Sequence, residues 1–133
     1  MSMTDPVADL LTRIRNASRV KKNAVDVPAS NLKREIVRIL RENRFLKDVI
    51  ELPDNKQGIM RVYLAYNRGD TPVLHDIQRI SRPGLRQYAN AEEIRLSTFN
   101  SRGITVISTS QGVMSNFDAT QKGIGGEVLL KCW

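Results

Sequence analysis

The spacing of apolar residues changes partway along the chain, and this change limits the fold more than any other feature. Near the amino end, apolar residues at positions 7, 10, 11, 14 and 17 recur with helical spacing, which predicts a helix that begins near Asp5 and Pro6. A second helix is expected from Ser30 to about Asn43, with a buried face of Leu32, Ile36, Ile39 and Leu40. Beyond it, apolar segments are strand-sized and separated by Pro, Gly, Asn and Asp, so the sequence predicts an α+β fold.

Breaker residues divide these segments into two predicted lobes. Residues 24–28, 45–52 and 59–66 are expected as strands, and the Asn-Arg-Gly-Asp-Thr-Pro segment at 67–72 is the expected boundary. We therefore expect an N-terminal α/β lobe over residues 1–67, with two helices on a short sheet. A mostly antiparallel β C-terminal lobe with short helical turns is expected over residues 73–133. Its predicted strands are 73–80, 85–89, 104–108 and 127–133, with helical turns at 91–98 and from Ser115 through Lys122.

The composition and residue inventory argue against several classes of protein. No apolar run approaches the roughly 18 residues needed to cross a bilayer. The first residues do not resemble a secretory signal. The single cysteine, Cys132, favours a reducing compartment. His75 is the only histidine, so a Ser-His-Asp set or a zinc site is not easily built, and no phosphate-binding P-loop is present. We expect no enzyme, cofactor, metal, membrane contact or small-molecule substrate.

The charge balance points to a polyanionic partner. Twenty-one Lys and Arg residues face fourteen Asp and Glu residues, which gives a net charge of +7 and favours nucleic acid, although solubility or an anionic membrane would also explain it. In the first lobe, Arg13, Arg15, Lys33 and Arg34 are the expected contacts to the phosphates of a nucleic acid. Glu35 is the only acid between Lys33 and Arg41, so we expect few ion pairs on that helix face.

Small hydroxyl side chains and glycines concentrate near the carboxyl end. Seven Ser and Thr residues lie between Ser97 and Ser110, and their hydroxyls both donate and accept hydrogen bonds, which suits base edges and ribose. Glycines at 112, 125 and 126 would let backbone amides approach RNA closely. A polar hairpin with turn glycines is the alternative interpretation. Tyr88, which follows Arg82 and Arg86, is the best aromatic candidate for stacking on a base.

Four blocks of the sequence together resemble the bacterial-type small-subunit ribosomal protein number eight family. They are residues 5–17, Ser30 to Leu40, Ile80 to Tyr88, and the Ser108–Met114 and Gly123–Glu127 segments with Trp133. This resemblance implies an α/β N-terminal lobe and a mostly antiparallel C-terminal lobe. It also implies binding to the central domain of small-subunit ribosomal RNA early in assembly, and, as in some members, repression of the protein's own message.

The resemblance also implies which residues contact RNA. The main contacts it assigns are Ser108, Thr109, Ser110, Gly112, Gly125, Gly126 and Glu127, and we add Lys122 to the candidates. We expect Glu127 to accept hydrogen bonds from loop hydroxyls or a base amino group, because phosphate would repel its carboxylate. The family often has glycine at the position of Arg44, so the left-handed residue that ends the second helix is expected at Asn43.

The expected partners and location follow from this resemblance. They are small-subunit ribosomal RNA and neighbouring small-subunit proteins, with the free protein a monomer, in the cytoplasmic ribosome or that of an organelle of bacterial descent. Two alternatives remain open: a basic adaptor that binds an acidic protein, and a small hydrolase that uses Ser110, for which the sequence offers no base.

Overall fold

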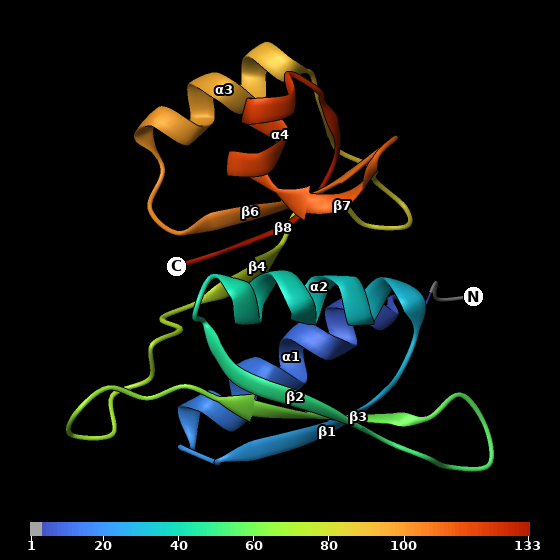
Figure 1. The fold of residues 1–133 in the computed structure, drawn as a ribbon, viewed down its shortest axis with the longest axis vertical. Helices are drawn as coiled ribbons and strands as arrows, with labels where there is room; N and C mark the ends of the chain where they lie inside the picture. Colours follow the sequence, from blue (N-terminus) through green and yellow to red (C-terminus); the bar gives the residue numbers. More distant parts are fainter. Residues whose placement is uncertain (1–3) are drawn as a thin grey trace. The chain divides into compact units, whose positions relative to one another are not determined.

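Helices and short strands follow one another in the computed structural model, which describes residues 4–133 except for the side chain of Asn100 (Figure 1). The elements are α1 (Pro6–Arg19), β1 (Ala24–Pro28), α2 (Asn31–Glu42), β2 (Leu46–Leu52), β3 (Ile59–Leu64), β4 (Ile77–Arg79), β5 (Tyr88–Ala89), α3 (Ala91–Asn100), β6 (Ile104–Thr109), β7 (Gly112–Ser115), α4 (Asn116–Lys122) and β8 (Gly126–Cys132). They form two compact units. The N-terminal unit is Val7–Asp76, and the C-terminal unit joins residues 4–6 with Ile77–Trp133.

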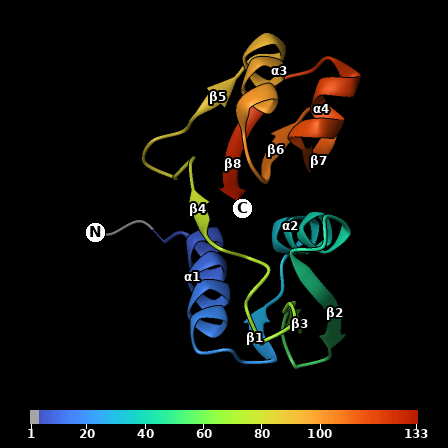
Figure 2. The same ribbon diagram turned by 90° about the vertical axis from the view of Figure 1, so that its left-hand side faces the viewer.

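The N-terminal unit is a three-stranded antiparallel sheet, ordered β1-β3-β2, with α1 and α2 on one face (Figure 2). Its core side chains come from both helices and from the middle strand, and include Leu10, Leu11, Ile14, Ile36, Leu40, Met60 and Val62, all at most 1% exposed. The apolar stripe predicted for the first helix is therefore confirmed. Each fully buried side chain of this size contributes about 2 kcal/mol to folding through removal of apolar surface from water.

The buried stripe of α2 differs from the predicted one. Ser30 caps the helix as expected, since its side chain accepts a hydrogen bond from the Lys33 amide. Leu32, however, is 38% exposed, while Val37 is fully buried and Lys33 is only 6% exposed. Lys33 buries its aliphatic stem and its ammonium reaches the Pro28 carbonyl. Ile36, Ile39 and Leu40 are buried as predicted, and only Leu32 is replaced on the inward face, where a charged residue buries its stem.

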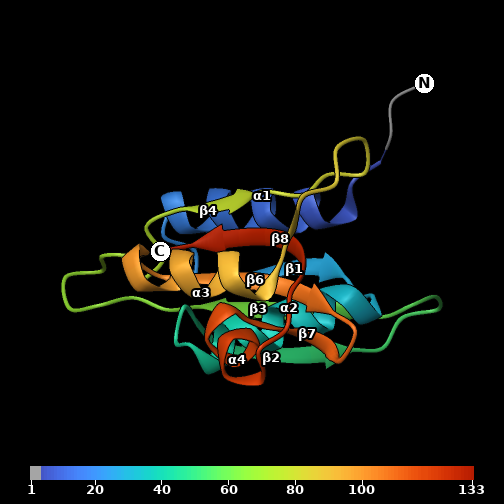
Figure 3. The ribbon, with the colours of Figure 1, turned by 90° about the horizontal axis from the view of Figure 1, so that it is seen from above.

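The C-terminal unit is an antiparallel sheet with two helices on one face (Figure 3). The order is β4-β8-β6-β7, and β5 also pairs with β8, so β8 lies between other strands on both of its edges. Ile94 of α3 and Ala119 of α4 pack with Ile107 and Met114 from the sheet. Asn90 and Glu93 form a capping box at α3, and Ser115 caps α4 as predicted. The α+β fold with two lobes is confirmed.

Two predicted strands are reduced to three and two residues in the structure. The strand expected over residues 73–80 is limited to Ile77–Arg79, and the one over residues 85–89 to Tyr88–Ala89. The first is shortened because Pro72 bridges to Tyr66 and the Val73 amide donates to the Ala65 carbonyl, which closes residues 66–72 into a loop. The chain passes from one unit to the other between residues 76 and 77. Residues 1–3 of the expected first lobe lie outside the described part of the chain.

Candidate RNA interface

Three adjacent strands of the C-terminal unit align Ser108, Glu127 and Tyr88 at one level of the sheet. Ser108 of β6 is directly opposite Glu127 of β8, and Glu127 is directly opposite Tyr88 of β5. Directly opposed residues in antiparallel strands point to the same face of the sheet. Ile107, the neighbour of Ser108, packs against α3 and α4, so Ser108, Glu127 and Tyr88 point to the face that these helices leave uncovered. We call this surface the hydroxyl face.

Glu127 is held by two partners from the segment that precedes β5. Its carboxylate accepts a short hydrogen bond from the Ser81 hydroxyl and a 3.0 Å bond from the Arg86 guanidinium. Ser81 is fully buried and its oxygen also accepts from the Gln87 amide at 3.1 Å. Burial raises the pKa of Glu127, but the bonds from Ser81 and Arg86 outweigh this, and the pKa lies below its usual value. The carboxylate is therefore ionised and its charge is compensated.

This arrangement corrects the protein partner expected for Glu127. The hydroxyl that reaches it belongs to Ser81 and not to the Ser108–Ser110 segment. Ser81 was missed because a single serine before a Pro-Gly turn carries no signal of burial in the sequence. Its position, next to Arg82, is set by reciprocal 3.0 Å backbone hydrogen bonds between Arg82 and Leu85, which fold residues 82–85 into a tight turn.

The Ser-Thr-Ser segment forms the end of the β6–β7 hairpin. Thr109 closes this turn internally, because its hydroxyl donates to the Gly112 carbonyl at 2.7 Å and accepts from the Gln111 amide at 3.1 Å. Ser110 is exposed at the tip. Within residues 4–133, neither the Ser108 nor the Ser110 hydroxyl has a hydrogen-bond partner in the protein. These two hydroxyls can therefore bind a ligand, whereas that of Thr109 stabilises the turn.

The three predicted contact glycines have different roles. Gly112 has a φ of +111° and no atom within 4 Å of where a side chain would begin, so its backbone is open to a ligand. At Gly126 an added Cβ would collide with the Ser108 carbonyl, and at Gly125 with the Ala89 carbonyl. The close approach that requires glycine at 125 and 126 is therefore between strands of the protein itself.

Tyr88 and two arginines border the hydroxyl face. Tyr88 is 70% exposed, and it lines a shallow hollow of about 440 Å³ that also includes Asn90 and the backbone of Gly125 and Gly126. Arg82 and Arg86 are both exposed. The structure thus brings Tyr88, Arg86, Glu127 and Ser108 together. An aromatic ring for stacking lies beside hydrogen-bonding groups, which is the combination that RNA recognition uses.

The remaining basic candidates are Lys122 and Arg13, which are exposed, and Arg15, which is partly buried. Lys122 lies in the last turn of α4, just before Gly123 ends the helix with a φ of 66°. Arg13 pairs with Asp9 at 3.0 Å and donates to the Asp26 carbonyl at 3.1 Å. Arg15 lies 3.5 Å from Asp76. Such solvent-exposed pairs are weak and exchange readily with phosphate.

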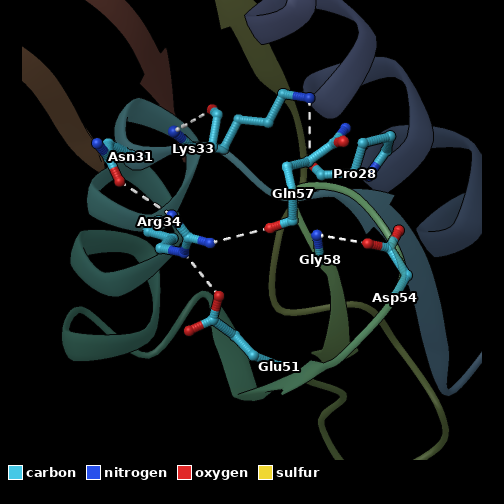
Figure 4. A network of polar contacts seen from close by, with 9 residues as sticks. Pro28, Asn31, Lys33, Arg34, Glu51, Asp54, Gln57 and Gly58 are labelled. Atoms are coloured by element: carbon cyan, nitrogen blue, oxygen red, sulfur yellow. Dashed lines mark hydrogen bonds and ion pairs between the residues drawn. The ribbon is translucent and has the colours of Figure 1, made fainter.

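Lys33 and Arg34 are engaged within the N-terminal unit (Figure 4). The Lys33 ammonium donates to the Pro28 carbonyl at 3.1 Å. Arg34 donates to the Glu51 carboxylate at 2.6 Å, the Asn31 side chain at 2.9 Å and the Gln57 carbonyl at 3.4 Å. Lys33 thus ties the start of α2 to the end of β1, and Arg34 ties it to the β2–β3 hairpin. The structure thus gives both residues a role inside the fold that their sequence pattern did not indicate.

The expectation that few ion pairs lie along the arginine row of α2 is wrong. Arg38 lies between Glu35 and Glu42, at 2.8 and 3.0 Å, and Arg41 lies 3.5 Å from Asp48. Together with the Arg34–Glu51 pair, these contacts compensate the whole row. Glu51 and Asp48 belong to β2, so a count of acids on the helix alone did not include them.

The chain is similar in sequence to known proteins of one family. The chain matches the family model described as Ribosomal protein S8 over residues 5–133. It is 48% identical to the "Small ribosomal subunit protein uS8" of Oceanobacillus iheyensis and of Enterococcus faecalis, and 49% identical to that of Desulfitobacterium hafniense. Each comparison covers the full length of both chains.

The names of these relatives describe ribosomal proteins and not enzymes, which agrees with the prediction that the chain has no catalytic activity. No helix among the described residues is long and apolar enough to cross a membrane. The family model covers all but the first four residues, and the relatives have the same length. The chain belongs to the ribosomal protein S8 family.

Proposed function

We propose that the protein is a structural constituent of the small ribosomal subunit, within the cytoplasmic ribosome, and that it binds small-subunit ribosomal RNA directly through the hydroxyl face. The RNA is a helical element of the central domain, and binding supports an early step of assembly. Membership of the S8 family and the names of the relatives support the ribosomal assignment. Neighbouring small-subunit proteins are the further partners, and the free protein is a monomer.

One observation carries the RNA-binding proposal. Ser108 and Ser110 offer unpaired hydroxyls beside the open backbone of Gly112, in an exposed hairpin that Thr109 holds in shape. An A-form helix presents ribose hydroxyls and base edges in a wide, shallow minor groove, which short hydroxyl side chains can approach without long flexible stems. Tyr88 adds a ring on which an unstacked base can lie.

Glu127 is suited to this surface because it is already compensated. Arg86 and Ser81 bind its carboxylate, which fixes the segment before β5 against β8 without leaving a free negative charge toward phosphate. We therefore assign Glu127 a positioning role. Arg82, Lys122, Arg13 and Arg15 supply attraction to phosphate that does not depend on sequence. Lys33 and Arg34 stabilise the N-terminal unit.

The direct test is Ser110→Ala, with the exposed Ser101 changed to Ala as the matched control. Loss of a hydroxyl contact should weaken binding to a central-domain RNA fragment by about 1–3 kcal/mol, with a smaller effect on a scrambled RNA of equal length. Titrations of both RNAs at fixed salt measure this difference. An equal loss on both RNAs, or the same loss for Ser101→Ala, would contradict the proposal.

Chemical footprinting of small-subunit ribosomal RNA with the purified protein then locates the binding site. Protection confined to one helical region of the central domain is expected. A protein adaptor that meets an acidic partner would give no protection on protein-free RNA. Repression of the protein's own message is part of the same proposal, because a messenger helix of matching shape would bind the same face. A reporter fused to that message should respond to wild-type protein and not to Ser110→Ala.

A further inference from the structure

A second concave surface, in the N-terminal unit, combines cations with aromatic rings. This hollow has a volume of about 530 Å³. Its lining comes from the end of α2, the start of β2, the end of β3 and the residue before β1, and comprises Asn23, Arg41, Arg44, Leu46, Lys47, Tyr63, Leu64, Ala65 and Tyr66. The lining contains three cations and no carboxylate, and we call it the Arg44 hollow.

Two irregularities of the backbone place cations at this hollow. Arg44 has a φ of 67°, in the left-handed region that side chains rarely adopt. Lys47 is the extra residue of a β-bulge, since Leu46 pairs with Leu64 and Asp48 already pairs with Tyr63. A bulge reorients the side chain of its extra residue. A left-handed arginine and a bulged lysine, three residues apart, thus line the same surface.

The charge of this hollow is only partly compensated. Asp48 lies beside it and pairs with Arg41 at 3.5 Å, with both side chains about half exposed. In the described part of the chain, neither Arg44 nor Lys47 has an ion-pair partner. This differs from Arg34 and Arg38, each of which contacts a carboxylate at 2.8 Å or less. Two uncompensated cations on a concave surface attract an anionic group.

The two tyrosines give the hollow flat walls. Tyr63 lies on the sheet face opposite to the buried Val62 and Leu64, and is partly exposed. The Tyr66 hydroxyl donates to the Lys22 carbonyl, which fixes the position of its ring. A phosphate bound by arginine and lysine next to a base stacked on tyrosine is the usual composition of a single-stranded nucleic-acid site. An acidic peptide would use the cations but gains nothing specific from the rings.

We propose that the Arg44 hollow is a second RNA site, which binds one unstacked nucleotide through its phosphate, at Arg44 and Lys47, and through its base, at Tyr63 or Tyr66. This inference rests on the proposed RNA-binding function but concerns a different unit of the protein and a single-stranded segment. The hydroxyl face would then bind a helical element, while the N-terminal unit holds a nucleotide outside the helix.

The test compares Lys47→Gln with Lys56→Gln in the full-length protein. Both are exposed lysines of the β2–β3 hairpin without an ion pair in the described residues, but Lys56 lies in the turn at its far end. The probe is a 5′-phosphorylated hexa-adenylate, titrated by fluorescence anisotropy over a range of salt. Lys47→Gln should weaken binding about threefold and make the salt slope shallower by about 0.7. Lys56→Gln should change neither quantity.

Further variants extend the comparison. Arg44→Gly combined with Lys47→Gln should weaken binding roughly tenfold, with a slope shallower by about 1.4, and glycine suits the left-handed position, so folding is not impaired. At least one of Tyr63→Leu and Tyr66→Leu should weaken binding about fivefold with no change in slope, since the substitution removes stacking but no charge. Equal effects of Lys47→Gln and Lys56→Gln, or tighter binding of hexaglutamate than of hexa-adenylate, would overturn the inference.

The same proteins separate this inference from the proposed function. Suppose that Ser110→Ala loses discrimination between central-domain and scrambled RNA, while Lys47→Gln and Lys56→Gln bind hexa-adenylate equally well. Only the inference about the Arg44 hollow is then wrong. If wild-type protein binds hexa-adenylate at the Arg44 hollow but does not distinguish central-domain RNA from scrambled RNA, the RNA-binding role proposed for the hydroxyl face is wrong. The inference about the Arg44 hollow is then supported.

Discussion

The two units use polar residues in opposite ways. In the N-terminal unit, the positive charges of Arg34 and Arg38 are compensated by ion pairs with acids of the same helix and of β2. In the C-terminal unit, Glu127 is the compensated group, while the neutral hydroxyls of Ser108 and Ser110 remain unpaired within the described chain. A count of basic residues therefore overstates the surface of the first unit that is available to RNA. It understates the second unit, whose binding groups carry no charge.

The largest expected effect concerns the packing of strands beneath the hydroxyl face. Gly126→Ala should destabilise the protein by about 3 kcal/mol, because the added methyl group collides with the Ser108 carbonyl across the sheet. Urea unfolding monitored by circular dichroism measures this loss. Gly112→Ala meets no neighbouring atom and should cost only about 1 kcal/mol, from its positive φ. Equal losses would show that β6 and β8 are not so closely packed.

Glu127→Gln tests the compensated carboxylate and should cost about 2 kcal/mol at neutral pH, since it weakens charge-assisted bonds from Ser81 and Arg86. The pKa of Glu127 is lowered in the folded protein. Its stabilising contribution is therefore present above the ordinary glutamate pKa and is lost as pH falls through the lowered value. The stability difference between wild type and variant should shrink in acid.

The same variant examines the positioning role. If Glu127 fixes the segment that carries Arg86 and Tyr88, Glu127→Gln should also reduce discrimination between cognate and scrambled RNA. If Glu127→Gln leaves RNA affinity and sequence preference unchanged, Glu127 does not contribute to the interface. A stability difference that does not vary with pH would contradict the ionised, hydrogen-bonded carboxylate.

Arg44→Gly is expected to stabilise the N-terminal unit by about 1 kcal/mol, because arginine is held at a φ of 67° that glycine adopts without strain. Thermal unfolding measures this gain, and Asn43→Gly is the control. Asn43 has a φ of −93° and its side chain donates to the Ile39 carbonyl, so that variant should be destabilised. A gain at Asn43 instead would place the left-handed residue one position earlier.

The smallest effect is expected for Arg34→Ala. Its pair with Glu51 is more than a third exposed on both sides, so its loss should cost only about 0.5 kcal/mol after screening by solvent. Affinity for central-domain RNA and its salt slope should stay unchanged, because Arg34 already donates to three protein oxygens. A salt slope that becomes shallower by about one unit would show that Arg34 contacts an RNA phosphate.

Features that depend on neighbouring residues were predictable from the sequence. The first helix and the caps at Ser30 and Ser115 follow from spacing and side-chain chemistry within one turn. Arg44 is an exception, since the expected left-handed residue was Asn43 and the structure places it one residue later. The expectation relied on the tolerance of asparagine for this conformation, but the Asn43 side chain is bonded to the last turn of α2 instead.

Features that depend on distant residues were not predictable in this way. Glu51 is 17 positions from Arg34, and Ser81 is 46 positions from Glu127, so only the folded chain shows these contacts. The hydroxyl segment itself was identified because Ser and Thr residues are concentrated there and because the family resemblance assigns this segment to RNA contact. Which of its hydroxyls are free was not evident, since Thr109 and Ser110 differ in role only through the turn that they form.

The position of β8 has a consequence for how the protein is made. This strand pairs with β4, β5 and β6, all of which precede it in the chain. During translation, the earlier strands therefore emerge without the element that joins them, and the sheet stays open until residues 126–132 leave the exit tunnel. A nascent chain cannot present Ser108, Glu127 and Tyr88 in register before that moment. The order of synthesis thus delays the assembly of these three residues on one surface until β8 is available.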